Sequence, residues 1–255
     1  MRTRVKTAGF VIRTLDYGES DRIVSFYTEE HGKIRGIAKG ARRSRKRFVN
    51  ALDIFSFSTI RFSQGDRGGL AFIEGCDVTR HYPRIRGDLD KTLTASYIIE
   101  LVDLFTVDGK RNTALFVLLR DFLDLIEESD PTEALLRFFE FRLLGLSGYE
   151  PLLEKCVACH RGIDGIVRPT FRLLDGGIRC EFCTVPGEND LTISPGTVKT
   201  LLFSRNMTVE RLPRVAFPPP SLQESRRLLH GMIHHILGRE IRSLSVLQSV
   251  SRILL

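Results

Sequence analysis

Apolar and polar residues alternate over short runs in the first 80 residues, the period-2 pattern of half-buried β-strands. These runs are rich in Val, Ile, Phe, Tyr and Thr, and turn residues separate them. They predict strands at 6–14, 22–28, 33–39, 54–62 and 70–79. The glycine-rich run 65–69 predicts the hairpin turn between the last two. Five short strands suit a small barrel.

The fourth predicted strand changes parity along its length. Its apolar positions move from Phe55 and Phe57 to Ile60 and Phe62. An added residue in a strand pair produces such a change, so the pattern predicts a β-bulge. Small barrels need bends of this kind to close.

After Asp88 the apolar residues recur at helical spacing. Helices are predicted at 89–104, 113–126, 132–146, 195–205 and 222–237. Ser194 and Ser221 are the expected N-caps of the last two. The proline run 218–220 is interpreted as a stiff connector into the final helix, and less readily as a ligand for a proline-recognition domain.

Four acidic residues in the second predicted helix recur at spacings that place them along one face: Asp121, Asp124, Glu127 and Glu128. They show no recognisable catalytic pairing. We expect them on the solvent side of that helix.

Together these patterns predict an α+β chain. Residues 1–80 form a five-stranded OB-type barrel, and residues 81–255 form a helical bundle domain. A zinc-ribbon-like module at 150–190 interrupts the helical domain, because helical periodicity is lost there and glycines mark turns.

Four cysteines in that module form two CxxC pairs, Cys156 with Cys159 and Cys180 with Cys183. Each pair can direct two thiolates to one ion at about 2.3 Å, and two pairs complete a closed tetrahedral site. The spacing predicts one structural Zn²⁺, which supplies folding energy rather than catalysis.

Alternatives for the cysteines are a redox-active pair, which needs only one CxxC near a βαβ unit, and four unligated core cysteines. Of the neighbouring candidates, His160 is expected on the surface and Cys76 in the barrel core. His230 and His234 are four residues apart on a predicted helix, but with no third ligand in view an ordinary amphipathic face is favoured.

The positive charge of the chain is concentrated in one segment. Of the 38 Lys and Arg residues, eight lie between positions 33 and 47 with no acidic residue among them, and the remaining 30 nearly balance the 31 acidic residues. The eight are Lys33, Arg35, Lys39, Arg42, Arg43, Arg45, Lys46 and Arg47. Lys33, Arg35 and Lys39 share parity on the third strand, and the others follow in a loop.

Such a run can be a solvated loop or a localisation signal. Its place on a small barrel favours nucleic-acid binding, since OB-type barrels bind single strands on an open face. Phe48, Phe57 and Phe62 are candidates for stacking on bases, and Gly36 and Gly40 would allow a ligand's backbone to come close.

Sequence motifs for nucleotide hydrolysis, serine hydrolases, zinc proteases and zinc deaminases are absent, so a non-enzymatic protein is expected. Basic residues and threonines interrupt the apolar residues of the first 20 positions, and no run approaches the roughly 18 apolar residues of a membrane span. We expect a cytoplasmic protein, with no membrane partner.

The run GFVIRTLDYGESDRIVSFYTEEHGKIRGIAKGARRSRKRF (9–48) and the later CVAC and CEFC pairs resemble the RecO family of bacterial recombination mediators. The resemblance covers essentially the whole chain, and its first part is the more specific. It implies an OB barrel followed by a helical domain that holds a zinc module.

The resemblance also implies an activity and partners. Members bind single- and double-stranded DNA, anneal complementary strands, and with RecR help load RecA onto strands coated by single-strand-binding protein. A nucleoid-associated place in the bacterial cytoplasm follows.

The family also implies a site on the helical domain for the acidic C-terminal tail of single-strand-binding protein. Its basic rim would come from among Arg137, Arg142, Lys199 and Arg205. The alternative function is a zinc-ribbon adaptor that binds RNA in transcription or translation.

Overall fold

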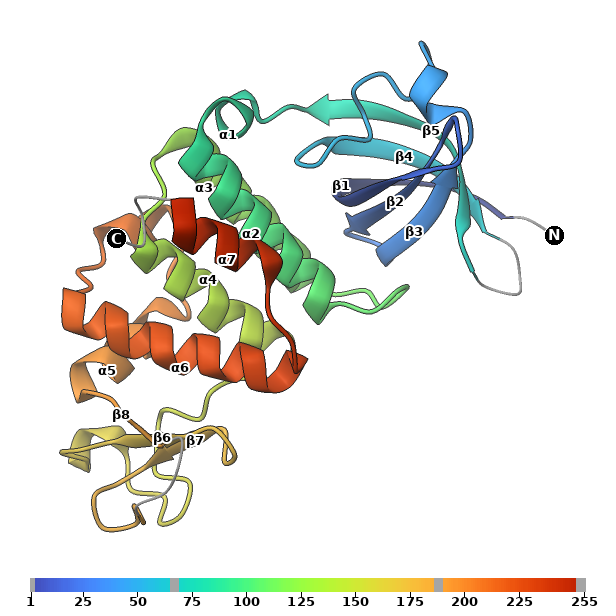
Figure 1. Ribbon diagram of the computed structural model, residues 1–255. Helices are drawn as coiled ribbons and strands as arrows, with labels where there is room; N and C mark the ends of the chain where they lie inside the picture. The colour runs from blue at the N-terminus through green and yellow to red at the C-terminus, as the bar shows by residue number, and fades with distance from the viewer. Residues whose placement is uncertain (1–2, 65–68, 186–189, 251–255) are drawn as a thin grey trace. The chain divides into compact units, whose positions relative to one another are not determined.

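The computed structural model describes residues 3–64, 69–185 and 190–250 (Figure 1). Most of the hairpin turn predicted at 65–69 lies outside these ranges. The chain divides into two compact units, residues 1–129 and 130–255. Among the described helices, none is both long and apolar enough to cross a membrane.

The first unit begins with a closed five-stranded barrel in the order β1-β2-β3-β5-β4. Its strands are β1 (Thr3–Tyr17), β2 (Asp21–Thr28), β3 (Gly32–Ala38), β4 (Phe57–Gln64) and β5 (Ala71–Arg80). Neighbours pair antiparallel except β3 and β5, which close the barrel as a short parallel pair. The predicted five-stranded OB-type barrel is confirmed.

Bulges bend the barrel, but the one predicted in the fourth strand lies opposite it, on β5. The register between β4 and β5 shifts after Phe57 and again after Arg61, with the added residues, Thr79 and Glu74, on β5. A further shift between Val11 and Arg13 leaves Ile12 as the added residue of β1. Each shift turns the following side chains to the other face of the sheet.

Residues 39–53, which we call the basic cap, close one end of the barrel between β3 and β4. The cap includes the short helix η1 (Ala41–Arg43). Ala41, Phe48, Ala51 and Leu52 of the cap join the buried apolar cluster that fills the barrel. The basic segment is therefore folded onto the core rather than extended into solvent.

Three helices complete the first unit: α1 (Pro83–Gly87), α2 (Leu89–Phe105) and α3 (Thr113–Glu128). Asp88 caps α2 and Asn112 caps α3 through their side chains. Both helices pack with α1, and α2 also contacts β1.

The expectation that the acidic residues of α3 face solvent is wrong for Glu127. Its carboxylate is buried and accepts hydrogen bonds from the backbone N–H groups of Arg84 (3.0 Å) and Ile85 (2.9 Å), in the first turn of α1. Asp124 accepts from the Tyr82 hydroxyl at 2.7 Å. These acids hold the start of α1 against α3. Negative charge is favourable there, because the N-terminal end of a helix carries a partial positive charge.

The second unit contains α4 (Glu133–Leu146), α5 (Pro195–Ser204), α6 (Pro219–Leu237), α7 (Arg242–Val250) and the short helix η3 (Val209–Arg214). Ser194 caps α5 as predicted. The cap predicted at Ser221 is wrong, because α6 begins three residues earlier than predicted, with Pro218 as its N-cap. Pro219 and Pro220 thus belong to the first turn of α6, where proline is tolerated. Helix α7 was not predicted.

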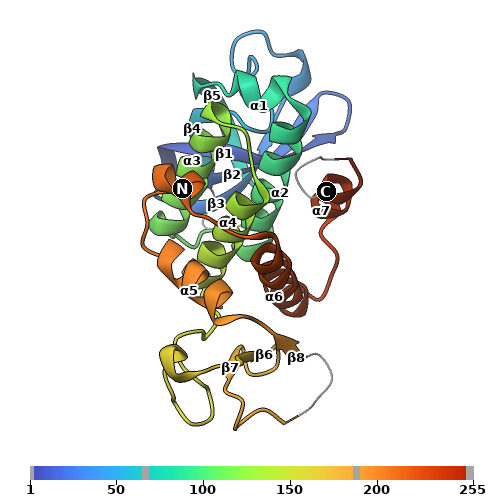
Figure 2. The ribbon, with the colours of Figure 1, turned by 90° about the vertical axis from the view of Figure 1, so that its left-hand side faces the viewer.

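A small module lies between α4 and α5 in the chain and beside α6 in space (Figure 1, Figure 2). It holds η2 (Ile163–Gly165) and a three-stranded sheet of β7 (Gly177–Arg179), β6 (Thr170–Arg172) and β8 (Asp190–Thr192). The four paired cysteines flank this sheet.

Candidate metal centre and nucleic-acid interface

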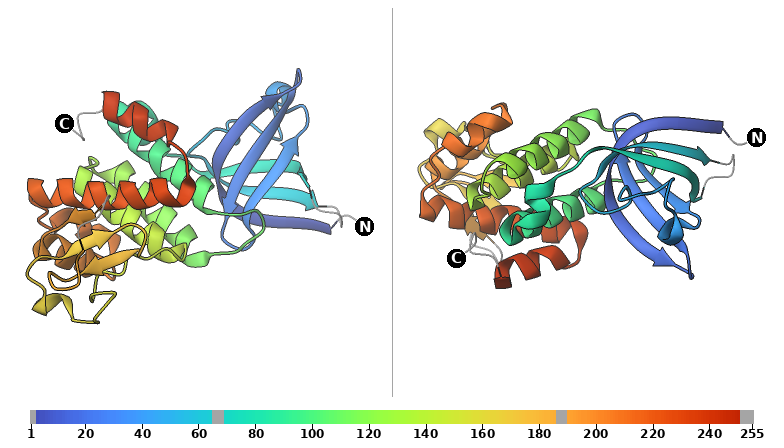
Figure 3. Two further views of the ribbon diagram at one scale, coloured as in Figure 1. Left: turned by 60° about the horizontal axis from the view of Figure 1, so that its bottom comes forward. Right: turned by 90° about the horizontal axis from the view of Figure 1, so that it is seen from above.

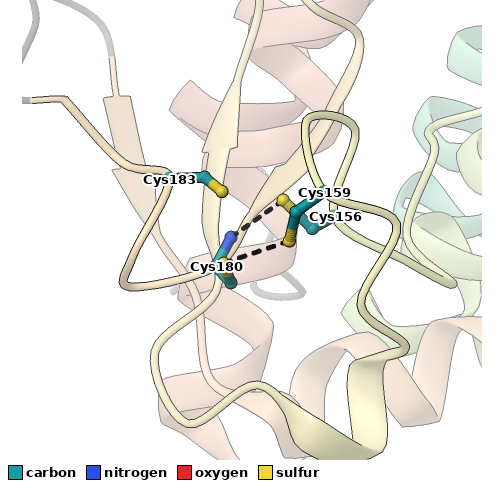
Figure 4. A group of neighbouring side chains, drawn as sticks. All are labelled: Cys156, Cys159, Cys180 and Cys183. Atoms are coloured by element: carbon teal, nitrogen blue, oxygen red, sulfur yellow. Dashed lines mark hydrogen bonds between the residues drawn. The ribbon is translucent and has the colours of Figure 1, made fainter.

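The two CxxC pairs converge in the small module of the second unit. Cys156 and Cys159 lie in a turn that a bridge between Lys155 and Gly162 closes, and Cys180 and Cys183 follow β7. Within both turns, backbone N–H groups donate to the carbonyl of the first cysteine, as from Cys183 to Cys180 at 3.0 Å. Figure 4 shows the four side chains gathered from the two turns.

The sulfur positions fit one tetrahedral metal ion. The four Sγ atoms all lie within 4.8 Å of one another, and those of Cys159 and Cys180 are 3.7 Å apart. A tetrahedral site with metal–sulfur bonds of about 2.3 Å requires sulfur separations of about 3.8 Å. All four cysteines are free thiols rather than disulfides, so the group can hold a metal ion.

The electrostatics of the cluster also favour a bound cation. Burial opposes ionisation of Cys156, but backbone N–H groups of Cys159, Cys180 and Ala158 donate to its sulfur and lower its pKa to about 6. Hydrogen bonding with the thiols of Cys159 and Cys180 raises the pKa of Cys183 to about 12. Without a cation, the cluster thus favours the thiolate of Cys156 and disfavours that of Cys183. A divalent cation would stabilise all four thiolates.

The other thiol and the nearby histidine lie where the sequence indicated. Cys76 is buried in the barrel core, and burial raises its pKa to about 11. His160 is exposed. Among the described residues, the four cysteines form the only metal-competent group of at least three Cys, His, Asp or Glu residues.

The eight predicted DNA-binding residues fall into two groups in the structure. Lys33 and Arg35 lie on β3, while the remaining six lie in the basic cap: Lys39, Arg42, Arg43, Arg45, Lys46 and Arg47. All six cap residues are exposed, as is Arg35. Lys33 differs, because its side chain is largely buried and its ammonium lies 3.1 Å from an Asp103 carboxylate oxygen.

Backbone hydrogen bonds fasten the basic cap to the barrel. Asp21 accepts from the Gly40 N–H at 2.8 Å, and this hydrogen bond lowers the pKa of the Asp21 carboxyl. Arg42 donates its N–H to the Ser20 carbonyl, and the Arg47 carbonyl accepts from Cys76 N–H of β5, both at 3.0 Å. The exposed cations of the cap are therefore carried on an ordered backbone.

The cap also encloses a polar hollow of about 420 Å³. Arg22, Arg42 and Arg45 line it, together with Ser44 and Asn50. Asp53 also lines it and lies 3.4 Å from the Arg22 guanidinium. Three guanidinium groups against one carboxylate leave an excess of positive charge, which suits an anionic ligand such as a phosphate.

The three phenylalanines considered for base stacking belong to the interior. Phe48 and Phe62 are buried in the barrel cluster, and the Phe57 ring packs 4.7 Å from that of Phe10. The interpretation of Gly36 is also wrong. A Cβ there would lie 2.4 Å from Ile73, so Gly36 allows β3 and β5 to approach rather than admitting a ligand.

The four basic candidates on the helical domain are placed very differently. Arg137 is fully buried and donates to Glu140 at 2.7 Å, and its guanidinium also lies 2.8 Å from His230 Nε2. Arg142 donates to the backbone carbonyls of Ser204, the last residue of α5, and of Met207 beyond it. Lys199 pairs with Asp164 at the surface.

Arg205 is the fourth candidate and borders a small cavity. It lies between Glu150 and Glu154, at 3.0 and 2.9 Å. The cavity of about 210 Å³ has both polar and apolar walls. Its charged or polar lining residues are Arg205, Lys155, Glu150, Glu154 and His160, and its apolar ones are Pro151, Leu152, Leu153 and Val157.

Comparison with known proteins identifies the family. The family model described as "Recombination protein O N terminal" matches residues 1–82, and "Recombination protein O C terminal" matches residues 86–245. A DNA repair protein RecO of Syntrophus aciditrophicus is 48% identical over 99% of both chains.

More distant relatives bear the same name. The protein from Geobacter metallireducens is 35% identical over 96% of this chain and 97% of its own. The protein from Halalkalibacterium halodurans is 29% identical over 93% of this chain and 92% of its own. These matches confirm the resemblance found in the sequence, and the chain belongs to the RecO family of DNA repair proteins.

Proposed function

We propose that this chain is a non-enzymatic recombination mediator that binds single- and double-stranded DNA through the basic cap. The observation that carries the proposal is the ordered display of six exposed cations on residues 39–47. Arg35 extends this surface along β3. Lys33 contributes to this surface only by stabilising β3, because its ammonium is paired with Asp103.

Strand annealing needs no covalent chemistry. Two complementary strands repel each other through their phosphates, and a cationic surface that neutralises part of this charge lowers the barrier to their meeting. Base pairing then supplies the favourable free energy. An ordered cap is suited to this role because less side-chain and backbone entropy is lost when DNA binds.

Family membership supports the partners of the proposal. In this role the chain acts with RecR to help load RecA onto single strands coated by single-strand-binding protein. The acidic C-terminal tail of that protein would bind at the Arg205 cavity, which offers apolar walls with Lys155 and Arg205 at its edge. Glu150 and Glu154 already pair with Arg205, so the tail must displace them.

A labelled peptide with the acidic tail sequence tests the Arg205 cavity. Arg205→Glu should weaken peptide binding at least about tenfold, in the range measured for truncating one partner of a charge pair. Lys199→Glu makes the same charge change at a surface pair outside the cavity and should have little effect. Equal loss in both variants would reject the cavity as the site.

For the metal centre we propose one structural Zn²⁺. Four thiolates in a closed tetrahedral set leave no open position for water or substrate, and this donor set is the one zinc prefers in structural sites. The ion would hold the two cysteine turns together, so its role is to fold the module.

A salt titration tests DNA binding. If the cap contacts several phosphates, the logarithm of the affinity for single strands falls linearly with the logarithm of salt concentration, with a slope of about −0.7 per contact. An affinity that does not change with salt would reject the proposed interface. Tighter binding to structured RNA than to single-stranded DNA would favour the RNA-adaptor function instead.

A further inference from the structure

The outer face of the barrel carries exposed apolar side chains close to the basic cap. Beyond the bulge at Ile12, the register of β1 places Arg13, Leu15 and Tyr17 on this face, opposite the side of the sheet that packs into the core. Leu15 is 56% exposed and Tyr17 is 54% exposed.

The strand register extends this apolar group across three strands. Leu15 of β1 lies directly opposite Ile23 of β2, which lies opposite Ile37 of β3. Both isoleucines are only partly buried. Directly opposed residues on one face of a sheet are neighbours, so the three side chains form a row, with Tyr17 at its end.

The other half of the same face is already covered by the chain itself. Tyr27 is fully buried, and its hydroxyl donates to the Asn112 carbonyl at 3.3 Å. The Gly109 N–H donates to the Lys33 carbonyl at 2.8 Å, so the loop before α3 lies along the start of β3. The uncovered part therefore begins where this loop ends, and it holds the row from Leu15 to Ile37.

Cations flank this uncovered part. Arg13 and Arg35 lie on the same face, and their side chains are 68% and 55% exposed. Each is only loosely paired, Arg13 with Asp103 at 3.8 Å and Arg35 with Asp108 at 3.9 Å. At the other end, Arg42 of the cap lies 3.7 Å from Asp16 and donates its N–H to the Ser20 carbonyl. The hairpin that carries Tyr17 and the basic cap thus lie at the same end of the barrel (Figure 3).

We infer that Leu15, Tyr17, Ile23 and Ile37 form a strip that contacts the bases of single-stranded DNA, with Tyr17 stacking on one base. The inference rests on the proposed DNA binding and adds what distinguishes single strands from duplex. Phosphates would follow the flanking cations while unpaired bases turn toward the strip. In a duplex the bases are already stacked and paired, so the strip would contribute nothing.

Stacking and charge have separable signatures. Loss of a stacking side chain weakens binding at every salt concentration by the same factor, whereas loss of a phosphate contact also reduces the salt slope. Truncating Tyr17 should therefore lower affinity by at least about fivefold, from the stabilisation of about 1–3 kcal/mol per stacked base, without changing that slope.

The test is fluorescence anisotropy with a labelled oligothymidine and a labelled hairpin duplex, over a range of salt, for the wild type and three variants. Tyr17→Ala should lose at least about fivefold on the single strand and nothing on the duplex. Tyr17→Phe keeps the ring and should match the wild type. Tyr149→Ala removes another half-exposed tyrosine, in the second unit, and should be silent.

Each outcome decides one question. Wild-type affinity in a correctly folded Tyr17→Ala protein, or an equal loss on single strand and duplex, would overturn the strip while leaving cap binding intact. A wild-type protein that does not bind the single strand, or binds it independently of salt, would instead reject the proposed function. Melting temperatures of the variants verify that they fold.

Discussion

Lys33 and Asp103 form a partly buried pair that fastens β3 to α2. The Lys33 ammonium lies 3.1 Å from the Asp103 carboxylate and 2.7 Å from the Asp103 backbone carbonyl. Their side chains are 11% and 18% exposed, so water replaces little of this interaction. One residue of the basic segment thus serves the fold, while its basic neighbours remain exposed.

Replacing this lysine should separate stability from DNA binding. Lys33→Met should lower the free energy of unfolding by about 1–3 kcal/mol, because it leaves Asp103 without its closest cation. Arg43→Met, in the exposed cap, should change stability by less than about 0.5 kcal/mol. Denaturant unfolding measures both. The salt slope of DNA binding should fall for Arg43→Met and stay unchanged for Lys33→Met.

The carboxylate of Glu127 should be one of the more important polar groups of the first unit. Glu127→Ala removes the acceptor of two backbone N–H groups in a buried place and should cost about 2–4 kcal/mol. Glu128→Ala, one residue later, removes an exposed partner of Arg84 and should cost less than about 1 kcal/mol. Similar melting temperatures for the two variants would contradict a stabilising role for the hydrogen bonds from α1 to Glu127.

Acid should loosen the basic cap through Asp21. Its folded-state pKa lies below the ordinary value of 3.8, chiefly because the carboxylate accepts from the Gly40 N–H. The stabilisation is therefore complete above pH 3.8 and is lost as the pH falls through the lower, folded-state pKa. The protection factor of the Gly40 amide against hydrogen exchange, read by NMR, should fall over that window.

Asp21→Asn provides the control for this pH dependence. The substitution removes the titrating group, so exchange at Gly40 should be faster than in the wild type above pH 3.8 and should lack the acid-dependent step. An unchanged acid-dependent step in Asp21→Asn would assign it to another carboxyl group.

The metal centre should determine the stability of the second unit. Cys156→Ser should abolish binding of one zinc ion per chain and lower the melting temperature, since metal binding free energy is folding free energy. Cys76→Ala also removes a buried thiol, but in the barrel, and should keep the metal content. Elemental analysis measures the zinc content of each variant, and calorimetry measures its melting temperature. An unchanged melting curve after verified zinc removal would contradict a structural role.

Local sequence patterns predicted the elements and the metal group well for a physical reason. Strand alternation, helical spacing and the two CxxC pairs are set by residues close together in the chain. The parity that put Lys33 and Arg35 on one face is confirmed by the pairing of β2 with β3, whereas Lys39 lies just beyond the end of β3.

Contacts between distant segments were outside the reach of these patterns. The burial of Lys33 depends on Asp103, 70 residues away, and the burial of Glu127 depends on the start of α1. Phe48 was considered for base stacking because nothing local shows that the cap folds back onto the core. Tyr17 of the proposed strip was not a candidate in the sequence, because β1 continues past the strand predicted at 6–14 and the bulge at Ile12 changes which residues face outward.

Annealing by a charge-reversed cap tests the central claim most directly. Arg42, Arg43 and Arg45 are changed to Glu together. The control makes the same three charge reversals at exposed residues of the second unit: Arg211, Arg214 and Arg239. Annealing of complementary oligonucleotides is then followed by fluorescence quenching. The account predicts that the cap variant loses annealing at least about tenfold while the control anneals like the wild type. Equal annealing by the wild type and a folded cap variant would contradict it.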